Sequence, residues 1–300
     1  MLLLLSSLLL GSPIVPKNTG DESYSETFTT FADLDDGTYV LLQFLFSNAG
    51  LGSNKAACRV LVVPDGAEGS NRSVQLSASE WSAQDKLLSV GTCALQQHAS
   101  TTVMSAEVDN VKAQITFSAT LAPKKLPDAR IEPKKNEFYE QDILIMSAPV
   151  QATWSIGGAS HSSAGFAQLD HTRSNTILPQ VAKGWYRFRG FRGATSVFAQ
   201  VRIDTKGAYH GWVYDSKSSS AQPVSKARLG MESFVDTSSQ SLFFTPASIV
   251  FEYKPLEAYG FVGQIAKAWV GNPVTRTYKG VGQFQGAEVS GILEIVEIEE

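Results

Sequence analysis

The sequence has few residues of the kinds that build metal and redox sites. It contains two cysteines, four histidines and four methionines among 300 residues. Two thiols without clustered histidines cannot form a zinc site, so we expect no metal. A glycine-rich phosphate loop, a nucleophile elbow and readable paired catalytic carboxylates are also absent. The chain carries no sequence signature of a familiar catalytic centre, and we expect no cofactor.

Charge is also scarce. Charged residues make up 18% of the chain, and the formal net charge is −4. A nucleic-acid partner would favour a broad basic surface, so this composition argues against one. Hydrophobic residues make up 43%, enough to bury sizeable cores. The length suits two domains of about 150 residues each.

Long apolar runs are confined to the start of the chain. The opening MLLLLSSLLLGSP has about the length of a signal-peptide core but lacks a positive flank, and no lipoprotein cysteine follows it. Residues 1–20 are therefore either an export segment, placing the protein in a periplasm or outside the cell, or the buried first segment of a cytoplasmic protein. Export would allow one disulfide between Cys58 and Cys93. Two buried free thiols are the slightly favoured alternative.

Apolar and polar residues alternate with a period of two along most of the chain. TYVLLQFLFSN, CRVLVV, STTVMSAEV and KAQITFSATL are typical of strands, and DLDDGTY and EVDNVKA of tight turns. The pattern predicts an all-β protein whose antiparallel sheets curl into barrels. One segment, GFVGQIAKAWVG (260–271), predicts a short helix near the C-terminus.

A proline-rich stretch, residues 121–142, interrupts the strand pattern. It holds three prolines among mixed charges, which central strands and helices both disfavour. We interpret it as a connection that leaves a first domain, residues 21–145, before a second domain, residues 146–300.

The segment WYRFRGF places two arginines on one strand face. Alternation predicts that Trp185, Arg187 and Arg189 share one face, while Tyr186 and Phe188 share the other. Two arginines two residues apart on an enclosed face need carboxylates, carbonyls or a ligand anion nearby.

Asp170 and His171 end the preceding strand, and a short return of the chain would bring them to Arg187 and Arg189. Asp170 could then accept a bidentate pair from an arginine, and His171 could titrate near neutrality. We expect these four residues to form one polar cluster. It is either a buried ionic cluster that fixes the loop TRSNTILP or the polar end of a ligand pocket.

A second candidate face carries aromatic rings. His210, Trp212 and Tyr214 alternate along AYHGWVYD and so share one side of a strand. Such a face is either packed core or the wall of an apolar ligand site.

The segment DHTRSNTILPQVAKGWYRFRGF resembles the signature region of the fungal oxidative-stress survival-factor family. FADLDDGTYVLLQFLFSN and LLSVGTCALQ are similar to strands of that family's first domain. The architecture more distantly resembles the carotenoid 1,2-hydratase (hydroxyneurosporene synthase) group and the lipocalin-like pericyclases. The likeness covers most of residues 24–295. It implies two tandem lipocalin-like barrels with an apolar-ligand cavity in or between them.

Two classes of function follow, because fold likeness cannot choose between them. The first is a non-catalytic protein that binds or carries an apolar lipid or polyene, with Trp185, Arg187, Arg189, His210, Trp212 and Tyr214 as ligand-binding residues. Its partner would be a small apolar molecule, with contact to a membrane surface during ligand exchange. The alternative is a cofactor-independent hydratase, isomerase or cyclase of a terpenoid or polyene, in which Asp170 or His171 is the general acid. It ranks second because neighbouring arginines would lower the pKa of an aspartate.

Overall fold

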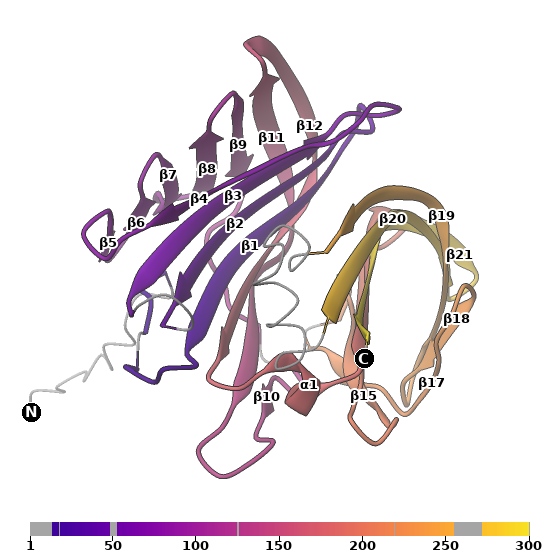
Figure 1. Cartoon of the computed structure of the whole chain (residues 1–300). Helices are drawn as coiled ribbons and strands as arrows, with labels where there is room; N and C mark the ends of the chain where they lie inside the picture. The colour runs from indigo at the N-terminus through magenta and orange to yellow at the C-terminus, as the bar shows by residue number, and fades with distance from the viewer. Residues whose placement is uncertain are drawn as a thin grey trace, which may run out of the picture.

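The computed structural model describes residues 14–17, 19–48, 53–124, 126–218, 220–254 and 272–299. Within these ranges the chain forms two curled antiparallel sheets and one helical turn, α1 (Leu178–Val181) (Figure 1). The predicted all-β class and antiparallel pairing are therefore confirmed. The helix predicted at 260–271 and the opening apolar run lie outside the described residues. No helix in the described part is long and apolar enough to cross a membrane.

The first sheet follows the order β4-β3-β2-β1-β12-β11-β9-β8-β7-β6-β5, with β10 paired to β11. It curls into a near-barrel (indigo to pink in Figure 1). Its strands are β1 (Ser25–Leu34), β2 (Tyr39–Ser47), β3 (Lys55–Val63), β4 (Ser70–Leu76), β5 (Trp81–Gln84), β6 (Leu87–Val90), β7 (Cys93–Gln97), β8 (Thr102–Val108), β9 (Val111–Phe117), β10 (Arg130–Ile131), β11 (Tyr139–Ile156) and β12 (Ala159–Ser174).

The second sheet follows the order β16-β15-β14-β13-β21-β20-β19-β18-β17 and forms a half-barrel (Figure 1). Among the described residues no strand pairing joins the two ends of either sheet, so the expected pair of closed barrels is not confirmed. The strands of the second sheet are β13 (Gly184–Gly193), β14 (Val197–Ile203), β15 (Tyr209–Asp215), β16 (Gln222–Pro223), β17 (Lys226–Arg228), β18 (Ser233–Asp236), β19 (Ser241–Tyr253), β20 (Asn272–Phe284) and β21 (Ala287–Glu299).

The chain changes sheets between Ser174 and Gly184, after the boundary expected near residue 145. That boundary falls inside β11, which pairs with β9 on one side and with β12 on the other. β11 and β12 therefore lie in the middle of the first sheet rather than at the start of a new strand series. The division of the chain into two independently folding domains stays a prediction.

Strand alternation divides the core into layers. One cluster fills the inside of the first sheet and includes Phe28, Val60 and Ile115. Another lies inside the curve of the second sheet around Phe188 and Phe244. A third joins the sheets, because the other face of β1 to β3 packs against residues of β13, β14, β15 and β21. Side chains that lie between the two sheets are consequently covered by a sheet on each side, which limits their exposure to solvent.

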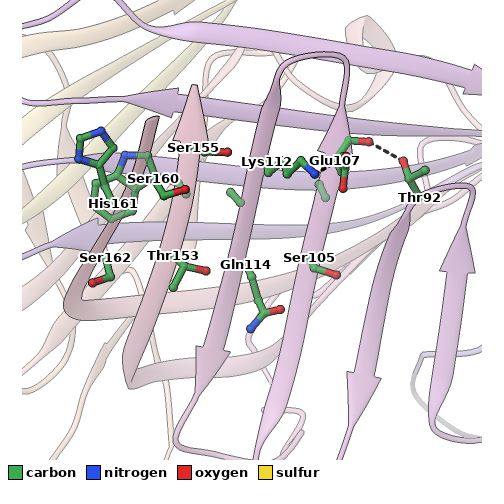
Figure 2. A pocket seen from close by; sticks show the side chains of 13 residues that line it. Thr92, Ser105, Glu107, Lys112, Gln114, Thr153, Ser155, Ser160, His161 and Ser162 are labelled. Carbon is green, nitrogen blue, oxygen red and sulfur yellow. Dashed lines mark hydrogen bonds and ion pairs between the residues drawn. The ribbon is translucent and has the colours of Figure 1, made fainter. Parts of the chain in front are cut away.

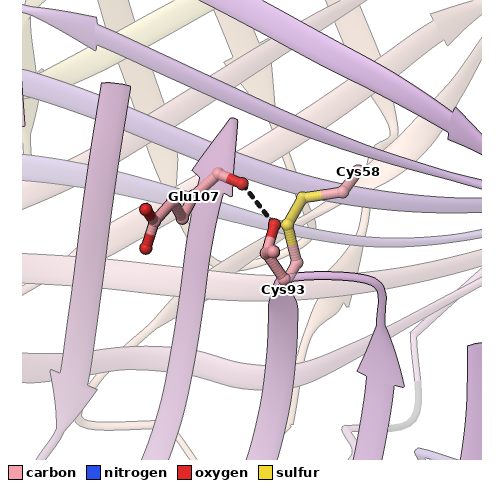
Figure 3. Close-up of a disulfide and its surroundings, with 4 residues drawn as sticks. Cys58, Cys93 and Glu107 are labelled. Carbon is pink, nitrogen blue, oxygen red and sulfur yellow. Dashed lines mark hydrogen bonds between the residues drawn. A yellow bond between two sulfur atoms is a disulfide. The ribbon is translucent and has the colours of Figure 1, made fainter. Parts of the chain in front are cut away.

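A disulfide joins Cys58 on β3 to Cys93 on β7, with the two Cα atoms 6.5 Å apart (Figure 3). These strands are distant along the sheet order, so the bond crosses the interior of the curled sheet. Both cysteines belong to the buried inner cluster. The slightly favoured expectation of two free thiols is therefore wrong, because the curl of the sheet brings the two strands to bridging distance.

Candidate functional site

β12 presents Asp170 and His171 to opposite faces of the first sheet. Asp170 faces the second sheet, where its Oδ2 accepts hydrogen bonds from Arg189 Nη2 and Gln141 Nε2, each at 3.3 Å. His171 faces the inside of the first sheet, with Nε2 2.6 Å from Glu26 Oε1. The imidazole also stacks on the Phe28 ring at 4.5 Å. The expected cluster of four is thus split, because the strand continues to Ser174 and successive side chains alternate.

The two arginines do share a face, as predicted, and both are neutralised there. Arg187 donates from Nη1 to Glu294 Oε1 at 2.5 Å and from Nε to Gln200 Oε1 at 2.9 Å. Arg189 donates from Nε to Gln168 Oε1 at 2.6 Å, and its Nη1 lies 3.9 Å from Glu294 Oε2. Arg189 and Glu294 are buried, with 2% and 4% of their surface exposed. Two guanidinium groups and two carboxylates therefore form an ionic cluster between the sheets.

Glu294 was not singled out from the sequence, although a signal for it was present. It stands in the apolar run GILEIV of β21 and pairs in register with Arg187 on β13. An acid inside a run that is buried on both faces needs a buried cation. The final strand was instead interpreted as having one wet face.

The two carboxyl groups of the cluster have opposite electrostatic settings. Burial raises the pKa of Asp170, and Glu294 adds to that rise, while Arg189 and Arg187 oppose it. Burial would also raise the pKa of Glu294, but Arg187 and Arg189 outweigh burial and hold that pKa below its usual value. Asp170 Oδ1 is buried and has no hydrogen-bond partner among the described residues. Asp170 is therefore the group of this cluster best placed to carry a proton.

A cavity of about 470 Å³ lies between the two sheets beside this cluster. Asp170, Arg187, Glu294 and Trp185 line it, whereas Arg189 does not. Much of the remaining wall is apolar or carries hydroxyl groups. These lining residues include Thr27, Thr29, Phe31, Leu41, Leu61, Ile177, Leu178, Phe251, Tyr253, Thr275 and Val296.

The predicted aromatic face lies next to this cavity rather than along it. Trp212 and Tyr214 are buried in the cluster that joins the sheets. His210 Nε2 lies 3.1 Å from Asp204 Oδ2, and with Trp212 it borders a separate space of only about 10 Å³. Trp212 and Tyr214 pack as core residues, whereas His210 is partly exposed, and a ligand-binding role of the three stays a prediction.

A second hollow, of about 640 Å³, lies on the outer face of the first sheet (Figure 2). Ser105, Gln114, Thr153 and Ser162 cross four strands in register, and a parallel row contains Lys112 and Glu107. Lys112 Nζ lies 2.6 Å from Glu107 Oε1, and both side chains are about half exposed. Hydroxyl and amide groups of this kind are usual on the wet face of an antiparallel sheet. The cavity between the sheets is the stronger candidate site, because its ionisable groups are buried.

No group of three or more potential metal ligands occurs in the described ranges. The functional groups that line the cavity are carboxyl, guanidinium, hydroxyl, amide and aromatic groups.

No family model matches the chain, and no curated protein matches it. The resemblance to the survival-factor family is therefore without support from either comparison.

Several solved structures share the fold along nearly the whole chain. A candidate AttH from Nitrosomonas europaea aligns with TM-score 0.59 and 12% identity, over 96% of this chain and 98% of that one. CghA, crystallised with Sch210972, aligns with TM-score 0.60 and 11% identity, over 96% and 94%. Kievitone hydratase from Nectria haematococca aligns with TM-score 0.55 and 11% identity, over 96% and 95%. At these identities the likeness concerns the fold alone, which is the lipocalin-like arrangement of two curled sheets.

Proposed function

We propose that the protein binds a small, mainly apolar organic molecule in the cavity between its two sheets. The observation that carries the proposal is the cavity itself: about 470 Å³, walled by apolar side chains, with a buried charged cluster at one side. Ligand sites usually have volumes of about 300–1,000 Å³ and combine apolar walls with a few placed polar groups. Burial of the apolar body would supply affinity, at about 25 cal/mol per Å² before ordering costs.

Fold neighbours support a ligand-binding or catalytic role for this architecture. One is named as a hydratase, and another was crystallised with Sch210972. A lipid or polyene fits the apolar wall best. If the protein carries such a ligand between membranes, loading and release require transient contact with a membrane surface.

The test is a substitution that fills the cavity. Thr27 lines the cavity and is half-buried on β1, so Thr27→Trp should displace the ligand. Thr116→Trp is the matched control, because Thr116 is half-buried on β9 away from the cavity. Protein purified from its own host should release one class of small molecule on organic extraction, detected by mass spectrometry. Thr116→Trp should keep that molecule and Thr27→Trp should lose it. Wild-type protein without any bound molecule, or a loaded Thr27→Trp, would refute the proposal.

A second function, acid catalysis without a cofactor, is favoured by Asp170. Its pKa is raised by burial, it lines the cavity, and its Oδ1 has no hydrogen-bond partner in the described part of the chain. Such a group could protonate a double bond of a bound terpenoid or polyene, which would lead to hydration, isomerisation or cyclisation. Arg189 at 3.3 Å favours the ionised form and keeps this function second.

Asp170→Asn separates the two functions. The amide can still accept a hydrogen bond from Arg189 but cannot deliver a proton. If the protein is an enzyme, this variant should retain the extracted molecule and lose its conversion to product. Equal conversion by the variant and the wild type would exclude Asp170 as the acid.

A further inference from the structure

Arg59 on β3 is a second cation that lines the cavity, and its surroundings differ from those of Arg187. Its Nε donates to Asn71 Oδ1 at 2.9 Å, and its guanidinium carbon lies 3.7 Å from the centre of the Tyr253 ring. These two contacts, one from each sheet, fix the plane of the guanidinium. The terminal Nη1 and Nη2 atoms have no hydrogen-bond partner among the described residues.

Arg59 also lacks a carboxylate partner among the described residues. Arg187 pairs with Glu294, and Arg189 pairs with Asp170 and lies near Glu294, whereas no acidic oxygen of the described residues lies within ion-pair distance of Arg59. Burial lowers the pKa of Arg59, although Tyr253, Tyr39 and Glu294 oppose this effect. A guanidinium nevertheless stays charged in proteins. Within the described part of the chain, the positive charge of Arg59 is therefore not balanced by direct contact with a carboxylate.

Strand register places Arg59 and Asp170 at opposite ends of one polar row. Arg59 pairs with Gln43, Gln43 with Thr29, and Thr29 with Asp170. The row crosses four neighbouring strands, so its ends are separated by roughly 14 Å at the usual strand spacing. The next row on the same face, Leu61, Leu41 and Phe31, is apolar. All seven residues line the cavity.

We infer that the ligand is an amphipathic organic anion, a monocarboxylate whose acid group binds the free edge of Arg59 while its apolar body extends along the cavity toward Asp170. This inference rests on the proposed function and specifies its ligand class. The planar fork of a guanidinium matches a carboxylate through two parallel hydrogen bonds. A single unbalanced cation near Glu294 favours one negative charge over two.

The probe is cis-parinaric acid, a fluorescent polyene carboxylate, compared with its methyl ester. Wild-type protein should bind the acid more tightly than the ester. Arg59→Gln should weaken acid binding by about tenfold or more, as expected for loss of a charge-assisted hydrogen bond, and weaken ester binding by a much smaller factor. Retained ester binding also shows that the variant is folded. Arg59→Lys, which keeps the charge but not the fork, should retain part of the preference for the acid.

Arg72→Gln is the matched control, because Arg72 is an exposed arginine on neighbouring β4. Equal weakening by Arg72→Gln and Arg59→Gln would mean nonspecific attraction and would overturn the inference. Equal affinity of wild-type protein for acid and ester, with both lost in Thr27→Trp, would overturn the anion preference and leave cavity binding intact. Acid binding that survives Thr27→Trp, or binding of neither probe by the wild type, would overturn the inference and the proposed function together.

Discussion

At the scale of single residues, Glu294 holds the buried charges of the site together. Its carboxylate is 2.5 Å from Arg187 and 3.9 Å from Arg189, and it is buried. A buried ion pair contributes little net stability, but removal of one partner leaves a charge without compensation. Removal of Glu294 should therefore cost more folding stability than removal of one member of an exposed ion pair.

Glu294→Gln should lower the free energy of unfolding by about 3–5 kcal/mol at neutral pH, because two arginines lose their shared carboxylate. Glu297→Gln on the same strand removes an acid from a pair with Arg276 that is partly exposed, and should cost at most about 1 kcal/mol. Urea unfolding of both variants provides the comparison. Equal, small losses would contradict the assignment of a buried ionic cluster.

Glu26 makes stability depend on acid pH. Burial raises its pKa, but hydrogen bonding and attraction from His171 outweigh burial, and the pKa lies below the ordinary value of 4.5. Because the folded pKa is below the unfolded one, its contribution is complete above pH 4.5. It is lost as pH falls from there through the folded pKa.

Urea midpoints of the wild type should therefore fall as the pH is lowered below 4.5, and Glu26→Gln should show a shallower decline there. Asp21→Asn is a suitable control, because Asp21 is exposed and its carboxylate accepts hydrogen bonds from the neutral side chains of Thr19 and Asn175. The same slope in Glu26→Gln and the wild type would show that Glu26 does not carry this dependence.

At the scale of elements, β3 and β7 are held together by the disulfide rather than by strand pairing. The bond closes a loop with a sequence separation of 35 residues. Chain entropy assigns a cross-link of this span roughly 4 kcal/mol of stabilisation, and typical measured values are about 2–4 kcal/mol. The curl of the first sheet thus has a covalent support within its apolar interior.

A reductant should lower the denaturation midpoint of the wild type by an amount equivalent to about 2–4 kcal/mol. The double variant Cys58→Ala/Cys93→Ala should start at that lower value and show no further response to reductant. Thiol titration of unreduced, denatured wild-type protein should find no free thiol. Two free thiols, or a midpoint insensitive to reductant, would show that the bond is absent or without effect.

At the scale of the whole molecule, β11 and β12 lie between β1 and β9 in the first sheet. The parts of the chain before and after the connection that precedes β11 therefore belong to the same sheet. Lys134 and Lys135 are exposed in the turn that precedes β11. A cut there leaves β9 and β1 in one fragment and β11 and β12 in the other. Those strands pair across the cut in the order β1-β12-β11-β9.

Limited trypsin digestion should therefore cleave early at Lys134 or Lys135 and yield two fragments that still elute together in size-exclusion chromatography. They should separate only in denaturant. Early cleavage between Asp170 and Phe191, or fragments that separate under native conditions, would contradict this organisation.

The sequence alone was sufficient to predict the all-β class, many of the strands and the shared face of Trp185, Arg187 and Arg189. These features follow from local alternation with period two, which side-chain chemistry sets directly. It also identified Asp170 as a partner of the arginines. It did not show that β12 continues past His171, which turns His171 to the opposite face from Asp170, or that β1 pairs with β12, which brings Glu26 to it.

Only the tertiary structure decided which strands are neighbours. Sheet order placed β11 and β12 between β1 and β9, brought Cys58 to Cys93 through the curl of the sheet, and set Glu294 opposite Arg187. It also left Arg59 beside the cavity, with no carboxylate of the described residues at ion-pair distance. Alternation tells which face a side chain occupies, but pairing register and sheet order depend on contacts between residues far apart in sequence. No local pattern encodes those contacts.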